Sequence, residues 1–371
     1  MKRIYLTIMI LVLACDILLG QCYGRYQTEI FSNVNKSTVN YSSNFFDTEH
    51  EMDIYTAAND TATNRPLIIF IHGGTYTGGD KSSVDCVDFC EFFAKRGYVT
   101  ASINYRLADN PLSFLFVQEE QYLTVLKSVA DVKAAIRFFR KDIANGNNYG
   151  VDENTIFVGG SSAGAITAIH LAYIDDISDL PITSTPNGVS VQSLALGIGG
   201  LEGDAGNNGY SSDINAVISF AGAINNVNWI NNLDEPLVSI QGDADQTVPY
   251  NCGPGLGYQT VLTLCGSNEM HNQANTVNIL NDFLLLPGAD HDWFQVGNND
   301  ARFIQALEFT KDFLYPLLPC NQITNLNEKF NDNKKLIEIK NIIGACSSNI
   351  KNQILLYIYD DGTVEKRINN K

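Results

Sequence analysis

Five residues near the middle of the chain, Gly160-Ser161-Ser162-Ala163-Gly164, constrain its fold more than any other stretch. They follow the apolar run 155–159 and precede residues 165–173, whose apolar positions have helical spacing. A strand, a sharp turn and a helix around Gly-x-Ser-x-Gly are typical of a nucleophile elbow, in which a strained turn exposes the serine hydroxyl. Small residues are needed on both sides of the serine because the strand and the helix nearly collide there. The pattern therefore predicts a reactive serine raised clear of a central sheet.

Two adjacent serines compete for this position. Ser162 has a glycine two residues before it and two residues after it, whereas Ser161 has Gly159 and Ala163 at those places. Spacing therefore favours Ser162 as the nucleophile. A serine hydroxyl is a poor nucleophile at neutral pH and needs a base. Histidine is the expected base because its pKa lies near working pH.

Apolar runs alternate with amphipathic stretches along most of the chain, which predicts an α/β fold class with a mostly parallel sheet. Residues 26–55 have the alternation expected of edge strands. The predicted inner strands are residues 66–71, 98–105, 155–159, 214–220, 237–241 and 282–286. The predicted helices are residues 84–96, 125–140, 165–173 and 301–318. Residues 175–213 interrupt the alternation, and we expect either a lid-like insertion or a plain surface insertion there.

Both ends of the chain differ from its middle. Residues 1–20 begin with Lys2 and Arg3 and continue as an apolar stretch, which predicts a cleaved signal peptide; an uncleaved anchor is the alternative. No later stretch is long enough to span a bilayer. We expect a catalytic domain over residues 21–319, a linker over 320–333 and a small β unit over 334–371. The mature protein is then expected to be secreted or displayed at the cell surface.

Charge and cysteine content narrow the possible partners and compartments. The net charge of −17 argues against nucleic acid, since a phosphate-binding surface is basic. One of the eight cysteines lies in the leader, so the remaining count is odd and one thiol is unpaired or the pairing is incomplete. Cys252 and Cys265 close a short loop and are the preferred disulfide. Cys86 and Cys90 stand one helical turn apart, and we expect each to have another partner. No Cys-x-x-Cys pattern supports zinc.

Several motifs in this order resemble the α/β-hydrolase fold, in its carboxylesterase and hormone-sensitive-lipase-like branch. They are His72-Gly73-Gly74 after the strand 66–71, the serine elbow, and then an acid and a histidine. Asp53-Ile54-Tyr55 and Asn104-Tyr105-Arg106-Leu107 also match this branch. The resemblance covers about residues 45–318. It implies a mostly parallel central sheet with helices on both faces, and hydrolysis of carboxylic esters through an acyl-enzyme without metal or organic cofactor.

The resemblance also assigns the catalytic histidine and the acid that orients it. His291, in the loop after the strand 282–286, stands where the family places its catalytic histidine. His50, His72, His170 and His271 are interpreted as structural. Asp245 follows the strand 237–241 in a Gly-x-x-Asp pattern and is the expected acid, with Asp243 as its competitor. Asp290 and Asp292 are interpreted as solvated loop charges, and Gln241 replaces a histidine that many relatives carry.

The oxyanion formed during acyl transfer needs two backbone N–H donors. Ala163 follows the nucleophile and is expected to supply one of them. The other should come from the His-Gly-Gly turn, with Gly74 as the first choice and Gly73 as the second. Thr75 stands where many lipase-like relatives have a third glycine.

Two apolar segments in the tail, residues 335–344 and 354–363, resemble the C-terminal sorting domain of type IX secretion. That resemblance implies a bacterial protein that passes the inner membrane by its leader and the outer membrane by the type IX machinery. Lys340 stands where that family has an aromatic residue, and Leu355 or Leu356 replaces its usual glycine. A structural β-hairpin extension is the alternative.

The sequence is compatible with three functions. The first is hydrolysis of a small-molecule, polysaccharide or lipid ester by the array Ser162, Asp245 and His291. The second is a peptidase or amidase on the same fold, and the third is an inactive hydrolase-like adhesion module. The acidic stretch Glu202-Gly203-Asp204 with Asn207 and Asn208 has the oxygen atoms that calcium prefers, but its spacing matches no known calcium loop.

Overall fold

The computed structural model describes residues 22, 24–182 and 188–320, together with the strand segments 336–341, 354–359 and 364–368. The chain divides into two compact units, one before and one after the boundary between residues 322 and 323. The predicted signal peptide and nearly all of the predicted linker lie outside the described residues. The two units are described separately.

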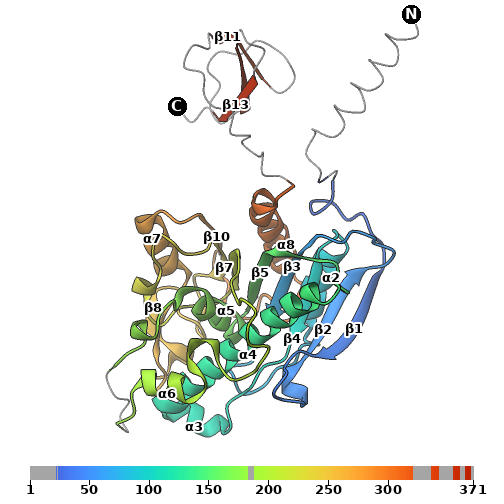
Figure 1. The fold of residues 1–371 in the computed structure, drawn as a ribbon. Coiled ribbons are helices and arrows are strands. Elements are labelled where there is room, and N and C mark those ends of the chain that lie inside the picture. The colour runs from blue at the N-terminus through green and yellow to red at the C-terminus, as the bar shows by residue number, and fades with distance from the viewer. Residues whose placement is uncertain are drawn as a thin grey trace, which may run out of the picture. The chain divides into compact units, whose positions relative to one another are not determined.

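An eight-stranded sheet forms the frame of the larger unit (Figure 1). Its spatial order is β1-β2-β4-β3-β5-β6-β7-β10. The strands are β1 Val34–Asn40, β2 Glu51–Ala57, β3 Arg65–Ile71, β4 Val99–Ile103, β5 Val151–Ser161, β6 Ala216–Phe220, β7 Leu237–Gly242 and β10 Asn281–Leu286. All pairs from β4 to β10 are parallel, whereas β1–β2 and β2–β4 are antiparallel. The expectation of a mostly parallel sheet is confirmed.

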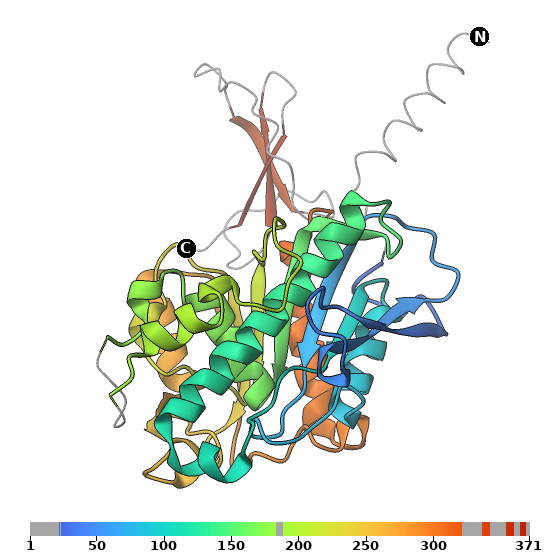
Figure 2. The ribbon, with the colours of Figure 1, turned by 60° about the horizontal axis from the view of Figure 1, so that its bottom comes forward.

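Helices cover both faces of this sheet because its central strands are apolar on both sides. In β3, Leu67 and Ile69 pack into one core while Ile68 and Phe70 pack into the other. This alternation follows from the two-residue period of a strand. Helices α4 and α5 lie over the first face, where α4 crosses the sheet diagonally (Figure 2), and α2 and α8 lie over the second.

The helices have the following bounds. They are α2 Val84–Ala94, α3 Pro111–Phe116, α4 Gln118–Ala144, α5 Ala163–Tyr173, α6 Val191–Gly197, α7 Ser267–Val277 and α8 Ala301–Leu314. Short 3-10 turns are η1 Thr48–His50, η2 Ile177–Asp179, η3 Gly200–Glu202, η4 Val227–Trp229, η5 Gly255–Gly257, η6 Gly297–Asn299 and η7 Tyr315–Leu317. A two-stranded ladder joins β8 Cys252–Pro254 to β9 Thr263–Cys265. Sequence periodicity predicts α2, α4, α5 and α8 but underestimates α4, whose first turns are polar.

The described residues of the segment 175–213 pack mainly on α4. The Glu202 carboxylate accepts hydrogen bonds from Lys133 and Arg137, at 2.9 and 2.6 Å. Asp204 binds Arg106 at 2.7 Å. The two carboxylates that could have suggested calcium are therefore paired with cationic side chains: Glu202 with two on α4, and Asp204 with Arg106 in the loop after β4.

Two disulfides lie within the larger unit. Cys252–Cys265 joins β8 to β9 and confirms the preferred pairing. Cys22–Cys320 joins residues 298 positions apart, a pairing that the sequence did not indicate. The expectation that Cys86 and Cys90 have other partners is wrong: both are free and buried. They lie on the face of α2 that packs against the sheet, and burial raises the pKa of both thiols. Cys346 lies outside the described residues.

The smaller unit contains a three-stranded antiparallel sheet. Its strands are β11 Leu336–Asn341, β12 Ile354–Tyr359 and β13 Val364–Ile368, in that spatial order. The first two strands lie within the apolar segments that the sequence identifies, and the third was not predicted. Among the helices of the described residues, none combines the length and apolar character required to cross a membrane.

Candidate active site

The turn between β5 and α5 holds Ser162 in a strained backbone conformation. Its φ is 52° and its ψ is −120°, which is unusual for a residue with a side chain. Its N–H donates to the carbonyl oxygen of Phe220 at 2.8 Å. A Cβ atom on Gly160 or Gly164 would lie 2.5 or 2.1 Å from the carbonyl oxygen of Ile71. The two glycines therefore let β3 approach the turn, which is the close contact that the elbow pattern predicts.

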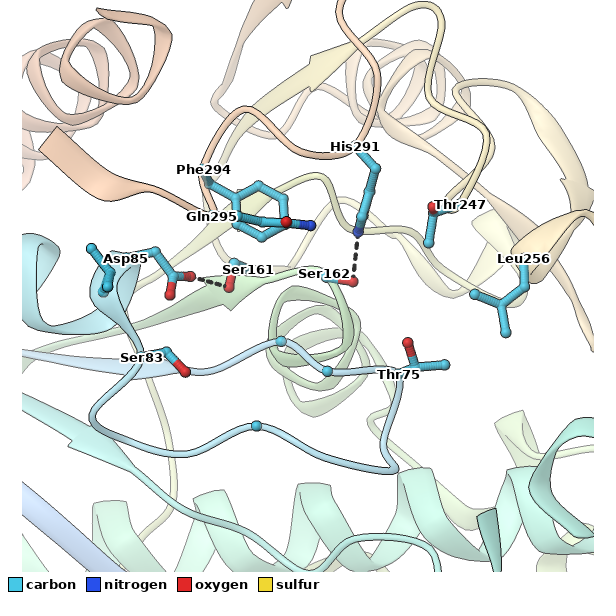
Figure 3. A pocket seen from close by; sticks show the side chains of 14 residues that line it. Thr75, Ser83, Asp85, Ser161, Ser162, Thr247, Leu256, His291, Phe294 and Gln295 are labelled. Atoms are coloured by element: carbon cyan, nitrogen blue, oxygen red, sulfur yellow. Dashed lines mark hydrogen bonds between the residues drawn. The ribbon is translucent and has the colours of Figure 1, made fainter. Parts of the chain in front are cut away.

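Ser162, His291 and Asp245 form one continuous hydrogen-bonded array (Figure 3 shows the Ser162–His291 contact). His291 Nε2 lies 2.8 Å from Ser162 Oγ, and His291 Nδ1 lies 2.8 Å from Asp245 Oδ2. All three residues are buried. An ionised carboxylate only accepts hydrogen bonds, so Nδ1 carries the proton and Nε2 is left to accept the serine O–H.

The loop after β7 fixes the orientation of Asp245. Its Oδ1 accepts the N–H groups of Thr247 and Val248 at 2.9 and 2.8 Å, which leaves Oδ2 for His291. The side-chain amide of the buried Gln241 also holds this loop in place. Its Nε2 donates to the carbonyl of Val248 at 2.9 Å, and its Oε1 accepts the N–H of Ser267 at 2.8 Å. Gln241 thus ties the acid loop to the start of α7.

Asp243, the competitor for the acid position, does not contact His291. Its Oδ1 accepts the N–H of Gly288 at 2.6 Å and so holds the start of the histidine loop. Asp290 and Asp292 are exposed, as expected of loop charges. However, Asp290 is more than a solvated charge, because its Oδ1 accepts the N–H groups of Gln246 and His291 at 2.9 and 2.8 Å. These two bonds lower the Asp290 pKa and join the acid loop to the histidine loop.

Ser161, the rival nucleophile, has a different partner. Its Oγ donates to Asp85 Oδ2 at 2.6 Å, and both side chains are buried (Figure 3). Burial raises the pKa of Asp85. Sequence reasoning missed Asp85 because it lies on α2, 76 residues before Ser161, and no local pattern connects the two.

The His-Gly-Gly turn follows β3 and lies beside the elbow. A Cβ atom on Gly73 would lie 3.2 Å from Ser162 Cβ. Gly74 has a φ of +119°, and a Cβ atom there would lie 2.1 Å from the carbonyl oxygen of Gly78. The N–H groups of Thr77 and Gly78 both donate to the Gly74 carbonyl, which closes a tight turn. Within the described residues, the N–H groups of Gly73, Gly74 and Ala163 have no hydrogen-bond partner in the protein.

The remaining histidines have structural contacts. His72 stacks on Tyr105, whose hydroxyl donates to the His72 carbonyl at 3.0 Å. His50 lies beside Asp47 and stacks on Phe45. The other two are helical. His170 Nδ1 lies 2.7 Å from the carbonyl oxygen of Ile166, and His271 Nδ1 lies 2.7 Å from Asn281 Oδ1. His271 lies within α7.

Two cavities meet at Ser162. The first, here the open cavity, has a volume of about 590 Å³ and is lined by His291, Phe294, Gln295 and Asp85 among others. The second, here the small cavity, has about 60 Å³ and almost wholly apolar walls. Gly73 and Gly74 line the open cavity and Ala163 lines the small one. The described residues of the segment 175–213 line neither.

Comparisons with known proteins find similarity to esterases over parts of the chain. The family model BD-FAE matches residues 52–227, which include the His-Gly-Gly turn and the elbow but neither Asp245 nor His291. Gut esterase 1 of Caenorhabditis elegans is 30% identical over 110 residues, 30% of this chain and 18% of that protein. Juvenile hormone esterase of Heliothis virescens is 31% identical over 119 residues, 32% of this chain and 20% of that protein. The chain thus spans about a fifth of the length of these curated relatives.

Solved structures extend the likeness over most of the chain. Esterase 2 of Thermogutta terrifontis phosphoramylated by tabun has a TM-score of 0.54 at 22% identity, covering 76% of this chain and 94% of that one. Its butyrate-bound form has a TM-score of 0.54 at 21% identity with the same coverage. The chain has the α/β-hydrolase fold. In this fold the nucleophile, acid and histidine follow one another along the chain, and the side chains of the array occur in the matching order, serine, aspartate and histidine.

Proposed function

We propose that this α/β-hydrolase cleaves carboxylic esters through an acyl-enzyme formed on Ser162. The observation that carries the proposal is the continuous array Asp245–His291–Ser162, with both contacts at 2.8 Å, at the edge of an open cavity. Ser162 Oγ attacks the ester carbonyl carbon while His291 Nε2 takes the hydroxyl proton. Asp245 holds the imidazole in the required tautomer and stabilises the imidazolium that forms.

The tetrahedral intermediate then collapses and expels the alcohol. His291 returns the proton from Nε2 to the leaving oxygen, so the alcohol departs neutral and the acyl group stays on Ser162 Oγ. A water molecule next gives a proton to His291 and attacks the acyl carbon, which releases the carboxylic acid and regenerates the serine. In both halves the oxyanion is held by the N–H groups of Ala163 and Gly74, with Gly73 as the second candidate in the turn.

An ester and an amide with the same acyl group test this proposal. We expect the protein to hydrolyse p-nitrophenyl acetate and to hydrolyse p-nitroacetanilide far more slowly, because amines are poorer leaving groups than phenols. A fluorophosphonate probe should label Ser162, read by mass spectrometry of the labelled peptide. Faster cleavage of the amide would favour a peptidase or amidase, and an unlabelled Ser162 would favour an inactive adhesion module. The esterase names of the relatives support the ester.

We also propose that the leader and the tail direct export. Residues 1–20 would be removed as a signal peptide, and residues 334–371 would be recognised by type IX secretion machinery. The two disulfides support an oxidising destination. In a bacterium with type IX secretion, the full chain should reach the cell surface or medium with Gln21 as its first residue. A chain ending at residue 333 should remain in the periplasm, and its export would overturn the tail's role.

A further inference from the structure

The two cavities at Ser162 lie beside different parts of the expected ester substrate. The assignment of the alcohol and the acyl chain to these cavities rests on the proposed function. His291 must reach the oxygen of the leaving alcohol, and it lines the open cavity but not the small one. Of the expected oxyanion donors, Ala163 lines the small cavity and Gly73 and Gly74 line the open one, so the acyl oxygen lies where the two cavities meet, and the small cavity is left for the acyl chain. In Figure 3, which draws the residues of the open cavity, Phe294, Gln295 and Asp85 lie on one side of Ser162, and Thr247 and Leu256, which also line the small cavity, lie on the other. The alcohol therefore belongs in the open cavity and the acyl chain in the small one.

The small cavity suits a short acyl chain. Its walls are mostly aliphatic and aromatic side chains, including Tyr76, Phe114, Ile166, Leu256 and Leu264. Its volume of about 60 Å³ is roughly a tenth of that of the open cavity. Beyond the carbonyl group, such a volume holds only a few carbon atoms.

A third cavity, here the rear cavity, lies behind the small one. It has a volume of about 50 Å³ and almost no polar surface. Ile166 and Leu264 line both the small and the rear cavity, so these two side chains form the wall between them. An apolar cavity of this kind stays dry and accepts apolar groups.

Helix α5 runs alongside both cavities. Ser162, Ile166 and His170 are spaced by four residues at and after its start, so they share one face at intervals of about 6 Å along the axis. Ser162 and Ile166 line the small cavity, and Ile166 and His170 line the rear one. The cavities thus follow one another along α5, in the direction that an extended chain attached to Ser162 would take.

His170 keeps the far part of this path uncharged. Its Nδ1 lies 2.7 Å from the Ile166 carbonyl, and its Nε2 accepts the N–H of Asn225 at 3.3 Å. Burial lowers the His170 pKa to about 4, so the ring is neutral at neutral pH. A neutral, fully hydrogen-bonded imidazole is compatible with an apolar ligand beside it.

We propose that the small and rear cavities form one acyl-binding path that Ile166 and Leu264 interrupt. The wild-type protein therefore accepts short unbranched acyl groups, and these two side chains set the limit on chain length. Removing either one joins the cavities and admits longer chains.

The test is the chain-length profile of p-nitrophenyl acetate, butanoate, hexanoate and octanoate. For the wild type, kcat/KM should be highest for acetate or butanoate. Ile166→Ala should raise the ratio of kcat/KM for octanoate to that for acetate at least about tenfold, since each newly buried methylene contributes about fourfold. Leu264→Ala opens the wall from the opposite side and should shift the profile in the same direction if Ile166→Ala does not fold.

Ile169→Ala is the matched control. It removes the same atoms from the same helix, at a fully buried site that lines neither cavity, and it should leave the profile unchanged. A wild type that prefers octanoate, or active wall variants with an unshifted ratio, would overturn the acyl path while leaving ester hydrolysis in place. A wild type that hydrolyses none of the four esters would overturn the proposed function, and the acyl path with it.

Discussion

Ser162→Ala is expected to reduce kcat for ester hydrolysis by roughly 10⁴- to 10⁶-fold while the protein stays folded. The substitution removes the only hydroxyl within hydrogen-bond distance of His291 Nε2 among the described residues. Without it no acyl-enzyme forms, and only substrate binding and the oxyanion donors remain. Alanine keeps the Cβ atom that serine already places at a φ of 52°, so the turn gains no strain. The measurement is steady-state kinetics with p-nitrophenyl acetate beside thermal unfolding.

Ser161→Ala provides a control at the neighbouring position. The Ser161 hydroxyl binds Asp85 and makes no contact with His291, so its loss should leave most of the activity. It should instead lower stability, because the buried Asp85 carboxyl loses a hydrogen-bond donor. If Ser162→Ala remains active and Ser161→Ala does not, the nucleophile is Ser161, and the spacing argument from the flanking glycines is wrong.

Local sequence predicts the parts of the site where two backbone segments lie so close together that only glycine fits. The positions of Gly160 and Gly164 are dictated by the Ile71 carbonyl, which leaves no room for a side chain. Gly74 is dictated in the same way by its positive φ and by the Gly78 carbonyl. Constraints of this kind fix residue type at fixed spacing, so a short pattern reveals them. The core alternation of β3 is visible for a similar reason, since strand geometry has a fixed period.

Contacts between segments that are far apart in the chain produce no short sequence pattern. Asp85 binds Ser161 across 76 residues, Asp290 binds Gln246 across 44, and Cys22 pairs with Cys320 across 298. Each depends on where the sheet brings two loops or helices together, not on the residues beside it. The small cavity is even harder to predict from the sequence, because its walls combine α3, α5 and the loops after β3 and β7. Sequence alone therefore predicted which three side chains the fold joins in one hydrogen-bonded array, but not the shape of the cavities beside them.

Asp245→Asn is expected to lower kcat by about 10⁴-fold, with little change in fold. In the native loop, Asp245 Oδ1 accepts two N–H groups and Oδ2 accepts the proton of His291 Nδ1. An asparagine has only one acceptor atom. Its oxygen should remain with the Thr247 and Val248 N–H groups, because the NH₂ group would face two donors there. The NH₂ group then faces His291 Nδ1, and the ring must take the tautomer with its proton on Nε2. That nitrogen can no longer accept the Ser162 proton.

Asp243→Asn separates this effect from a general disturbance of the loop. Asp243 Oδ1 accepts one N–H, from Gly288, and the asparagine oxygen can accept it equally well. The control variant should therefore keep its activity, although it loses the same charge two residues away. Nitrogen chemical shifts of His291 distinguish the tautomers directly, and Asp245→Asn should move the protonated site from Nδ1 to Nε2. Unchanged shifts with full activity would mean that Asp245 does not orient the base, whereas inactivity of Asp243→Asn alone would assign that role to Asp243.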